Sequence, residues 1–523
     1  RLIQETWEQN DTVVQTSSYT YDAAGNLVKA TDPNSTYAFA FDALNRVVEV
    51  DNAGTPLLPH VWLEYTYDAA GHVTEINDNL GGWEKSAYDA QGNLASRTWK
   101  RSGAGAIRVD YTRDASGRAT ELKRFADEAG TQQVGRTSTA YDKVGRVTNL
   151  THRDAIDAVL AEYAYTWDLA GQLTRQTDHG QTTEYDYDLT GQLTAADRSA
   201  QTDEAYAYDA NGNRKNGGFV TGPNNQVLSD GTFNYAYDDE GNIVRKTHVT
   251  SGARTEYTYD FLNRLVGVEE RDGGGTVVHE VQYIYDVFGR RIGQVVDGTT
   301  TFTVYRQDGA PAPLSPYSLA VRLDAPWADF DDTGAVLAEY LSGPGVDDLL
   351  ARARPGEGVS WYLPDQQGSM RDITDADGSV VDHVDYDSFG AVMGETNPAA
   401  GDRFKFTGRE YEPVTGLYYY RSRVYDPTLG RFINLDPLGF DAGDANLYRY
   451  VGNSPATGVD PSGLVVFAPG PASSFAPPGQ HPQFVPGPSA PSGQFSPGFG
   501  RPPSAPTRLP RSLVVPRPRG FSA

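Results

Sequence analysis

Aspartate is the residue type of this chain that is placed to do chemistry, and it occurs in two settings. Twelve aspartates stand two variable residues before a Gly or Asn, in a phrase that begins with an aromatic residue in eleven copies. Two later ones, Asp436 and Asp460, are each followed by Pro, one variable residue and Gly. Aspartates can bind calcium or act as a general acid or base. The chain has no cysteine, which excludes disulfides, zinc-thiolate sites and cysteine nucleophiles.

The twelve repeated aspartates stand at positions 22, 42, 68, 89, 114, 142, 168, 188, 209, 238, 260 and 286. The third residue after each is Gly in ten copies and Asn45 or Asn263 in the other two. Because Gly and Asn tolerate positive φ, this exchange predicts a left-handed residue. We predict turns at Asp22 and Gly25, Asp42 and Asn45, Asp260 and Asn263, and Asp286 and Gly289.

Each copy has the pattern of a β-hairpin. Aromatic residues alternate before the aspartate, as in Tyr283 and Tyr285, and a short apolar run follows the Gly. This favours a strand, a turn opened by Asp, a left-handed bulge and a return strand. Twelve equivalent catalytic sites are implausible, so we interpret these aspartates as structural and the tyrosines as core rather than sugar-binding. The fifth copy has Arg113 before Asp114, which predicts an edge hairpin or a distorted turn.

Composition supports an all-β protein. The chain has 523 residues, 55 Gly, 32 Tyr and 38% hydrophobic residues, and no long amphipathic helix. A net charge of −25 argues against nucleic acid as a partner and favours solubility as the role of the surface charge. No apolar run reaches the roughly 18 residues of a membrane span, and no signal peptide opens the chain. Residues 1–18 have the pattern of the end of an earlier repeat, so we expect a fragment or mature product that lacks its targeting segment.

The repeated Tyr-Asp-x-x-Gly phrase resembles the YD repeats of the bacterial RHS family, which are shared with the C component of insecticidal toxin complexes and with teneurins. The resemblance extends over nearly all of residues 1–464. It implies a β-hairpin ribbon that spirals into a hollow shell.

Residues 301–464 keep the pattern of strands and turns, but with different sequence motifs. Tyr386-Asp387-Ser388-Phe389-Gly390 is a thirteenth YD-like turn. The ordered motifs that begin at Phe406-Thr407-Gly408-Arg409-Glu410 and end at Asp460-Pro461-Ser462-Gly463-Leu464 resemble the RHS-associated core domain. In that family the core closes the shell, and an aspartyl self-protease with paired Asp-Pro-x-Gly motifs cuts just after the second motif. The polypeptide beyond the cut, commonly a toxin, stays inside.

Carried over by position, the resemblance implies that Asp436 and Asp460 are catalytic and that the Leu464–Val465 bond is cleaved. Two carboxylates that share a proton suit peptide hydrolysis, because one activates water while the protonated one polarises the carbonyl. Arg431 is a candidate to orient a carboxylate or the carbonyl. Asp441 or Asp444 is an alternative to Asp460. Asp followed by Pro and Gly is also an ordinary turn, so a purely structural role stays open.

The last 59 residues, 465–523, hold 15 of the 32 prolines, five arginines and no acidic residue. Such a sequence cannot bury enough apolar surface to fold, so we expect a disordered tail. It is either a solvated linker or a cargo held by the acidic shell. The predicted domains are therefore a YD-repeat shell over 1–300, a core domain over 301–464 and this tail.

The sequence thus predicts an encapsulating shell for its own C-terminal segment, with autoproteolysis after Leu464. At most this is a single-turnover enzyme, and we predict no cofactor and no metal site. Alternatives are a non-catalytic cell-surface protein for adhesion or carbohydrate binding, and a shell whose cargo has been lost. A capping partner or a cell-surface glycan is a possible further partner. We expect a bacterial protein that is secreted or lies at the cell surface.

Overall fold

The computed structural model describes residues 1–9, 11–101, 105–307 and 325–467. They fall within one compact unit, Arg1–Val485. Most of the tail predicted for 465–523 lies outside the described residues, which end at Phe467. Within the described ranges the regular structure is strands and four short 3₁₀ turns, without an α-helix, which confirms the all-β prediction.

The first sheet has 18 strands, and each pairs antiparallel with the next along the chain. These strands are β1 (Gln4–Gln9), β2 (Thr12–Tyr21), β3 (Leu27–Thr31), β4 (Thr36–Phe41), β5 (Val47–Asp51), β6 (Trp62–Tyr67), β7 (Val73–Asp78), β8 (Trp83–Tyr88), β9 (Leu94–Lys100), β10 (Ile107–Arg113), β11 (Ala119–Phe125), β12 (Gln133–Tyr141), β13 (Val147–Asp154), β14 (Val159–Trp167), β15 (Leu173–Asp178), β16 (Gln181–Tyr187), β17 (Leu193–Arg198) and β18 (Glu204–Ala205).

The second sheet continues the same meander with 16 strands. These strands are β19 (Phe219–Thr221), β20 (Val227–Asp230), β21 (Phe233–Tyr237), β22 (Ile243–His248), β23 (Arg254–Tyr259), β24 (Leu265–Arg271), β25 (Val277–Tyr285), β26 (Arg291–Val296), β27 (Thr299–Tyr305), β28 (Pro326–Asp331), β29 (Val336–Ser342), β30 (Leu349–Arg354), β31 (Gly358–Pro364), β32 (Met370–Thr374), β33 (Val380–Tyr386) and β34 (Val392–Glu395). We call the two sheets together the wall; it runs on through residue 301 to Glu395.

The repeated turns have the predicted geometry, as the turn at Asp142 shows. The Asp142 N–H donates to the Arg146 carbonyl at 2.9 Å, and the Gly145 N–H donates back to the Asp142 carbonyl at 3.1 Å. The Asp142 carboxylate accepts the N–H groups of Val144 and Arg146. Across the twelve copies φ is +76° to +97° at the ten glycines and close to +60° at Asn45 and Asn263. The left-handed position inferred from the Gly/Asn exchange is confirmed.

In several copies the side chain four residues after the aspartate couples the turn to the next one. Arg146 donates to the Asp142 carboxylate at 2.7 Å and to the Asp168 carbonyl, in the following copy, at 2.7 Å. Its guanidinium also lies over the Trp167 ring, 5.7 Å from the centroid. All twelve copies carry a donor side chain at this position: Asn26, Arg46, His72, Asn93, Arg118, Arg146, Gln172, Gln192, Asn213, Asn242, Arg264 and Arg290.

In most copies the aromatic residue before the aspartate bonds back to the preceding hairpin. The Tyr67 hydroxyl donates to the Val47 carbonyl at 2.6 Å, and the Tyr285 hydroxyl donates to the Leu265 carbonyl at 2.8 Å. The tyrosine two residues earlier points into the core, as Tyr65 does at 5% exposure. These side chains are therefore packing groups of the wall.

The expectation for the fifth copy is wrong. The Asp114 turn is regular, and β10 pairs with strands on both sides, so this hairpin is neither distorted nor at an edge. Arg113 replaces the missing tyrosine because its guanidinium donates to the Leu94 carbonyl of the preceding hairpin at 3.3 Å. A long donor side chain at this position is enough to bridge the hairpins.

The two edges of the first sheet differ in their turns. In a meander every second turn lies on the same edge, so the YD turns of the first sheet share one edge. Their loops all have the length of the Asp142 turn. On the other edge the connections vary, from two residues between β15 and β16 to ten residues, 52–61, between β5 and β6.

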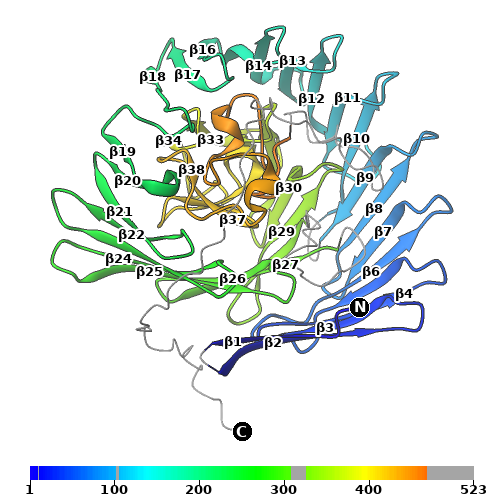
Figure 1. The fold of residues 1–523 in the computed structure, drawn as a ribbon. Helices are drawn as coiled ribbons and strands as arrows, with labels where there is room; N and C mark the ends of the chain where they lie inside the picture. The colour runs from blue at the N-terminus through cyan, green and yellow to red at the C-terminus, as the bar shows by residue number, and fades with distance from the viewer. Residues whose placement is uncertain (10, 102–104, 308–324, 468–523) are drawn as a thin grey trace. The chain divides into compact units, whose positions relative to one another are not determined.

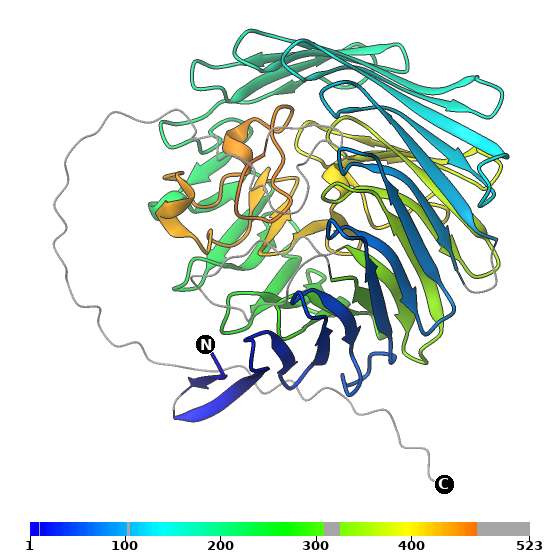
Figure 2. The ribbon, with the colours of Figure 1, turned by 90° about the vertical axis from the view of Figure 1, so that its right-hand side faces the viewer.

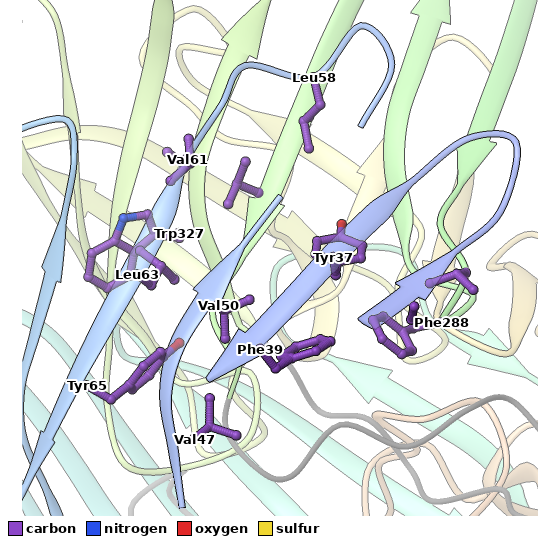
Figure 3. Close-up of a cluster of buried hydrophobic side chains, with 14 of the residues drawn as sticks. Tyr37, Phe39, Val47, Val50, Leu58, Val61, Leu63, Tyr65, Phe288 and Trp327 are labelled. Atoms are coloured by element: carbon purple, nitrogen blue, oxygen red, sulfur yellow. The ribbon is translucent and has the colours of Figure 1, made fainter. Parts of the chain in front are cut away.

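The ribbon winds over itself, so that part of the second sheet packs on the first (Figures 1 and 2). One shared core joins Tyr37, Phe39 and Leu63 of the first sheet to Phe288 and Trp327 of the second, as Figure 3 shows in part. A second core joins β9 and β10 to β29, β30 and β31. These contacts support the spiral that the RHS resemblance implies.

Residues 402–467, which we call the plug, lie against the inner side of the wall (Figure 1). They contain a small sheet of β35 (Glu410–Glu412), β36 (Leu417–Tyr420), β37 (Arg423–Asp426) and β38 (Arg431–Phe432). Leu417 and Tyr419 of the plug share a core with Tyr257 and Tyr283 of the wall. The plug is thus held by aromatic packing on strands far from it in sequence.

The repeated turn can be tested at Gly171, where φ is +90° and a Cβ would meet no atom within 4 Å. We expect Gly171→Ala to lower the free energy of unfolding by about 1–2 kcal/mol, purely through the cost of a left-handed non-glycine residue. Gly171→Asn should cost less than Gly171→Ala, because Asn tolerates the left-handed region better than Ala does. Urea denaturation measures both, and equal losses in the two variants would contradict this account of the turn.

Candidate functional site

The two Asp-Pro-x-Gly motifs both form turns in the plug, after β38 and close to the end of the described chain. Gly439 N–H donates to the Asp436 carbonyl at 2.9 Å, and Gly463 N–H donates to the Asp460 carbonyl at 3.3 Å. Both aspartates are buried: Asp436 is 7% exposed and Asp460 is 2% exposed. Each motif is therefore a turn that buries its aspartate.

Arg423, at the start of β37, brings the two aspartates together. Its Nη2 lies 3.0 Å from Asp436 Oδ2 and 3.2 Å from Asp460 Oδ2, so the two oxygens cannot be farther apart than the sum of those distances. The guanidinium lies over the Phe432 ring, 3.6 Å from its centroid, and donates to the Leu447 carbonyl at 3.1 Å. One buried cation thus serves two buried carboxylates.

Burial sets the electrostatics of this pair. It raises the pKa of both Asp436 and Asp460 above the ordinary value, and the charge of Arg423 opposes the rise in each. Asp460 also raises the pKa of Asp436 by charge repulsion. Burial lowers the pKa of Arg423, although the carboxylates oppose that shift. With two buried carboxyl groups and only one guanidinium beside them, the site favours a state in which one carboxyl keeps its proton.

Asp460 points at the Leu464–Val465 bond. Its Oδ1 accepts the N–H groups of Leu464 and Val465, each at 3.0 Å, and the hydroxyl of Ser462 at 3.1 Å. Val465 N is the nitrogen that would leave if this bond were hydrolysed. Leu464 is buried, and an antiparallel bridge between Val459 and Phe467 closes the loop around it.

The loop before this bond is clamped by three consecutive plug residues. Arg421 Nη1 donates to the Pro461 carbonyl, Ser422 N–H donates to the Ser462 carbonyl at 3.1 Å, and Arg423 Nε donates to the Gly463 carbonyl. Gly463 has φ +70°, and a Cβ there would come within 2.5 Å of the Tyr420 carbonyl. The loop therefore fits the plug only with glycine at this position.

The other candidates lie elsewhere. Arg431 donates to Asn446 at 3.0 Å and to Asn213 at 3.3 Å, so its contacts are with amides of the plug and the wall rather than with the aspartates. Asp444 pairs with Arg449 at 2.7 Å, and Asp441 is exposed. The structure thus groups Asp436 and Asp460 without these three residues.

Sequence reasoning missed Arg423. A signal was present, because Arg421 and Arg423 follow three consecutive tyrosines in a strand pattern that predicts full burial. A buried arginine needs hydrogen-bond acceptors, and the Asp-Pro turns offered two carboxylates.

Neither a metal cluster nor a membrane helix is found in the described part of the chain. No group of three or more His, Asp or Glu side chains there is arranged to hold a metal ion. Among those same residues, none of the helices has the length and apolar character that crossing a bilayer requires.

Comparison with known proteins assigns the fold to a family. A model of the teneurin YD-shell matches residues 113–456, and the RHS repeat matches residues 8–37 and 21–56. The chain belongs to the YD-shell family. Like it, the TcdB2–TccC3–Cdc42 crystal structure and the Photorhabdus luminescens Tc holotoxin pore have this fold, each with a TM-score of 0.58. They are 17% and 16% identical to this YD-shell chain and cover 88% and 91% of it, while it covers 26% and 27% of theirs.

Two bacterial toxins are similar to this YD-shell chain in sequence. Double-stranded DNA deaminase toxin A of Burkholderia cenocepacia is 28% identical over 88% of this chain and 31% of its own length. Toxin protein Tse5 of Pseudomonas aeruginosa is 26% identical over 77% of this chain and 36% of its own length. The chain therefore spans about a third of each of these relatives.

The role of Arg423 as a shared counter-ion can be tested by Arg423→Gln. Loss of the buried cation leaves two buried carboxylates unpaired, so we expect unfolding free energy to fall by about 3–5 kcal/mol at neutral pH. Because the pKa of both aspartates is already raised, lowering the pH protonates them in the folded state and should shrink the loss.

The matched control is Arg449→Gln, which breaks the half-exposed pair with Asp444 and should cost at most about 1 kcal/mol. Denaturant midpoints of both variants at neutral and acidic pH give the comparison. A loss for Arg423→Gln that grows as the pH falls would contradict the shared counter-ion.

Proposed function

We propose that the protein is a shell that carries its own C-terminal segment and cleaves the Leu464–Val465 bond by itself. The observation that carries the proposal is the contact of Asp460 Oδ1 with Val465 N, on a carboxylate linked to Asp436 through Arg423. A carboxyl beside the leaving nitrogen and a second carboxyl close by are the two groups that peptide hydrolysis requires.

In the proposed reaction Asp436 is the base and Asp460 the acid. The Asp436 carboxylate takes a proton from a water molecule, whose oxygen forms a bond to the Leu464 carbonyl carbon. Protonated Asp460 gives its proton to Val465 N as the carbon–nitrogen bond breaks. The products are a carboxyl group on Leu464 and an amine on Val465. Arg423 stabilises whichever carboxyl is ionised, since it contacts both.

The raised pKa values of both aspartates support a pair that keeps one proton, and the roles of acid and base are assigned from the position of Asp460 beside Val465 N. Asp460 keeps its proton more readily than an ordinary aspartate because it is buried. Val465 N–H donates to Asp460 while the peptide is planar. Asp460 can donate its proton to Val465 N only after water has added to the Leu464 carbonyl carbon, because a planar amide nitrogen is not an acceptor. Since the reaction is intramolecular, the dyad needs to work only once.

The shell role rests on the fold and on the relatives. The wall winds around the plug, and the relatives DNA deaminase toxin A and Tse5 are toxins that are longer than this chain. We therefore propose that the cargo is the polypeptide that follows Leu464, and that the protein is secreted or lies at the cell surface. Adhesion through tyrosine stacking on glycans has less support, because tyrosines such as Tyr19 and Tyr163 are buried in the wall.

Cleavage is tested by mass spectrometry of the full chain. We expect a C-terminal fragment that begins at Val465 and comprises the 59 residues 465–523. Asp436→Asn and Asp460→Asn should each leave the chain intact, because each removes one of the two proton carriers. Asp441→Asn, at an exposed aspartate between the two motifs, should cleave like the wild type. An intact wild-type chain with a folded shell would refute the proposal.

The rate of cleavage should depend on pH. Asp460 must be protonated, so the rate should fall as the pH rises above the pKa of the pair, which burial places above the ordinary value. Because Asp436 must be ionised, the rate should fall again in strong acid, which gives a bell-shaped profile. We expect faster cleavage at about pH 5 than at about pH 8. A profile that rises steadily to alkaline pH would instead indicate a different nucleophile.

A further inference from the structure

The wall is tied to the plug beside the second Asp-Pro-x-Gly motif. The loop between β29 and β30 carries Asp347, whose side chain is 10% exposed and lies between two plug arginines. Asp347 Oδ1 is 2.7 Å from Arg409 Nη1 and 2.6 Å from Arg421 Nη2, and Asp347 Oδ2 is 3.1 Å from Arg421 Nη1. Arg421 therefore grips the carboxylate with both ends of its fork.

The same guanidinium reaches the cleavage loop. Arg421 Nη1 also donates to the Pro461 carbonyl, the first of the three carbonyls that residues 421–423 clamp. A continuous line of contacts thus runs from Asp347 of the wall through Arg421 to Pro461, three residues before Leu464. Other plug–wall ion pairs among the described residues, such as Arg291–Glu410 and Arg403–Asp329, do not involve this loop.

Backbone conformation marks both members of the pair. Arg421 has φ +59° and Asp347 has φ +55°, in the left-handed region that ordinary residues avoid. The Asp347 carbonyl also lies so close to the plug that a Cβ at Gly408 would come within 2.8 Å of it. Strained residues persist only where the surroundings hold them, which they do here once the wall loop is docked.

The charge state of Asp347 agrees with this role. Burial alone would raise its pKa, but Arg409 and Arg421 outweigh that effect and lower it, so Asp347 is ionised at neutral pH. An ionised Asp347 fixes the Arg421 fork, and the fixed fork fixes the Pro461 carbonyl. If Asp347 is neutral or replaced, the Arg421 side chain is free to adopt other rotamers.

We propose that Asp347 is a positioning residue for the cleavage of the Leu464–Val465 bond, so that cleavage waits until this wall loop has closed on the plug. The inference rests on the proposed self-cleavage and adds a condition to it. The Asp347–Arg421 pair aligns the loop, and Asp436 and Asp460 act on it. Release of the cargo from the chain is thereby coupled to completion of the wall around it.

The test follows cleavage over time in the full chain made by cell-free translation. We expect Asp347→Asn to slow the first-order rate at least about tenfold, since a small misplacement of a reacting bond has effects of this size. Its pH profile should keep the wild-type shape, because Asp436 and Asp460 still set the profile. Asp347→Glu, which keeps the charge, should recover most of the rate.

The matched control is Glu410→Gln. Glu410 is also a buried acid that pairs with two arginines, Arg291 of the wall and Arg403 of the plug, but it does not contact the cleavage loop. We expect its rate to stay within about twofold of the wild type at comparable loss of stability.

Two outcomes would overturn the inference: a wild-type rate in Asp347→Asn, or an equal slowing in Glu410→Gln. If the wild-type chain itself does not cleave, the proposed function fails first, and that result is distinct from both.

Discussion

Eleven of the twelve YD aspartates of the wall are bonded to a donor side chain four residues later, and the wall depends on this contact. Where the donor is an arginine, as in Arg146, it holds its own turn, lies on the next aromatic ring and donates to the next turn. The next tyrosine in turn bonds back to the preceding hairpin. Neighbouring hairpins are therefore joined by side chains as well as by the strand ladder, which fixes their spacing along one edge.

Much of the wall could be predicted from local rules. The exchange of Gly25 for Asn45 or Asn263 at one position predicted a left-handed residue, because only backbone sterics are involved. The bridging role of Arg113 could not be predicted in the same way. It depends on the distance to a carbonyl in the preceding hairpin. Either a tyrosine or an arginine can span that distance, but the sequence alone does not give it.

The candidate site could likewise be predicted only in part. The family resemblance named Asp436 and Asp460, and the structure places both on one guanidinium. Arg431 was predicted from its nearness to Asp436 in sequence, but its contacts are with Asn213 and Asn446, and Arg423 has the central position. Which of several arginines meets a buried acid depends on how β37 packs on the rest of the plug. Sequence spacing does not show which arginine this is, although a buried arginine always requires a partner.

The unequal edges of the first sheet have a consequence for how such a ribbon can change. Its YD edge is bound by loops of one length and by the donor side chains that follow the aspartates, so an insertion there breaks contacts with both neighbours. The opposite edge already accommodates connections of two to ten residues. New surface can therefore accumulate on one rim without disturbing the strand register, much as loops diversify on a rigid scaffold. The ribbon conserves its geometry on one side and leaves the other free to acquire new recognition.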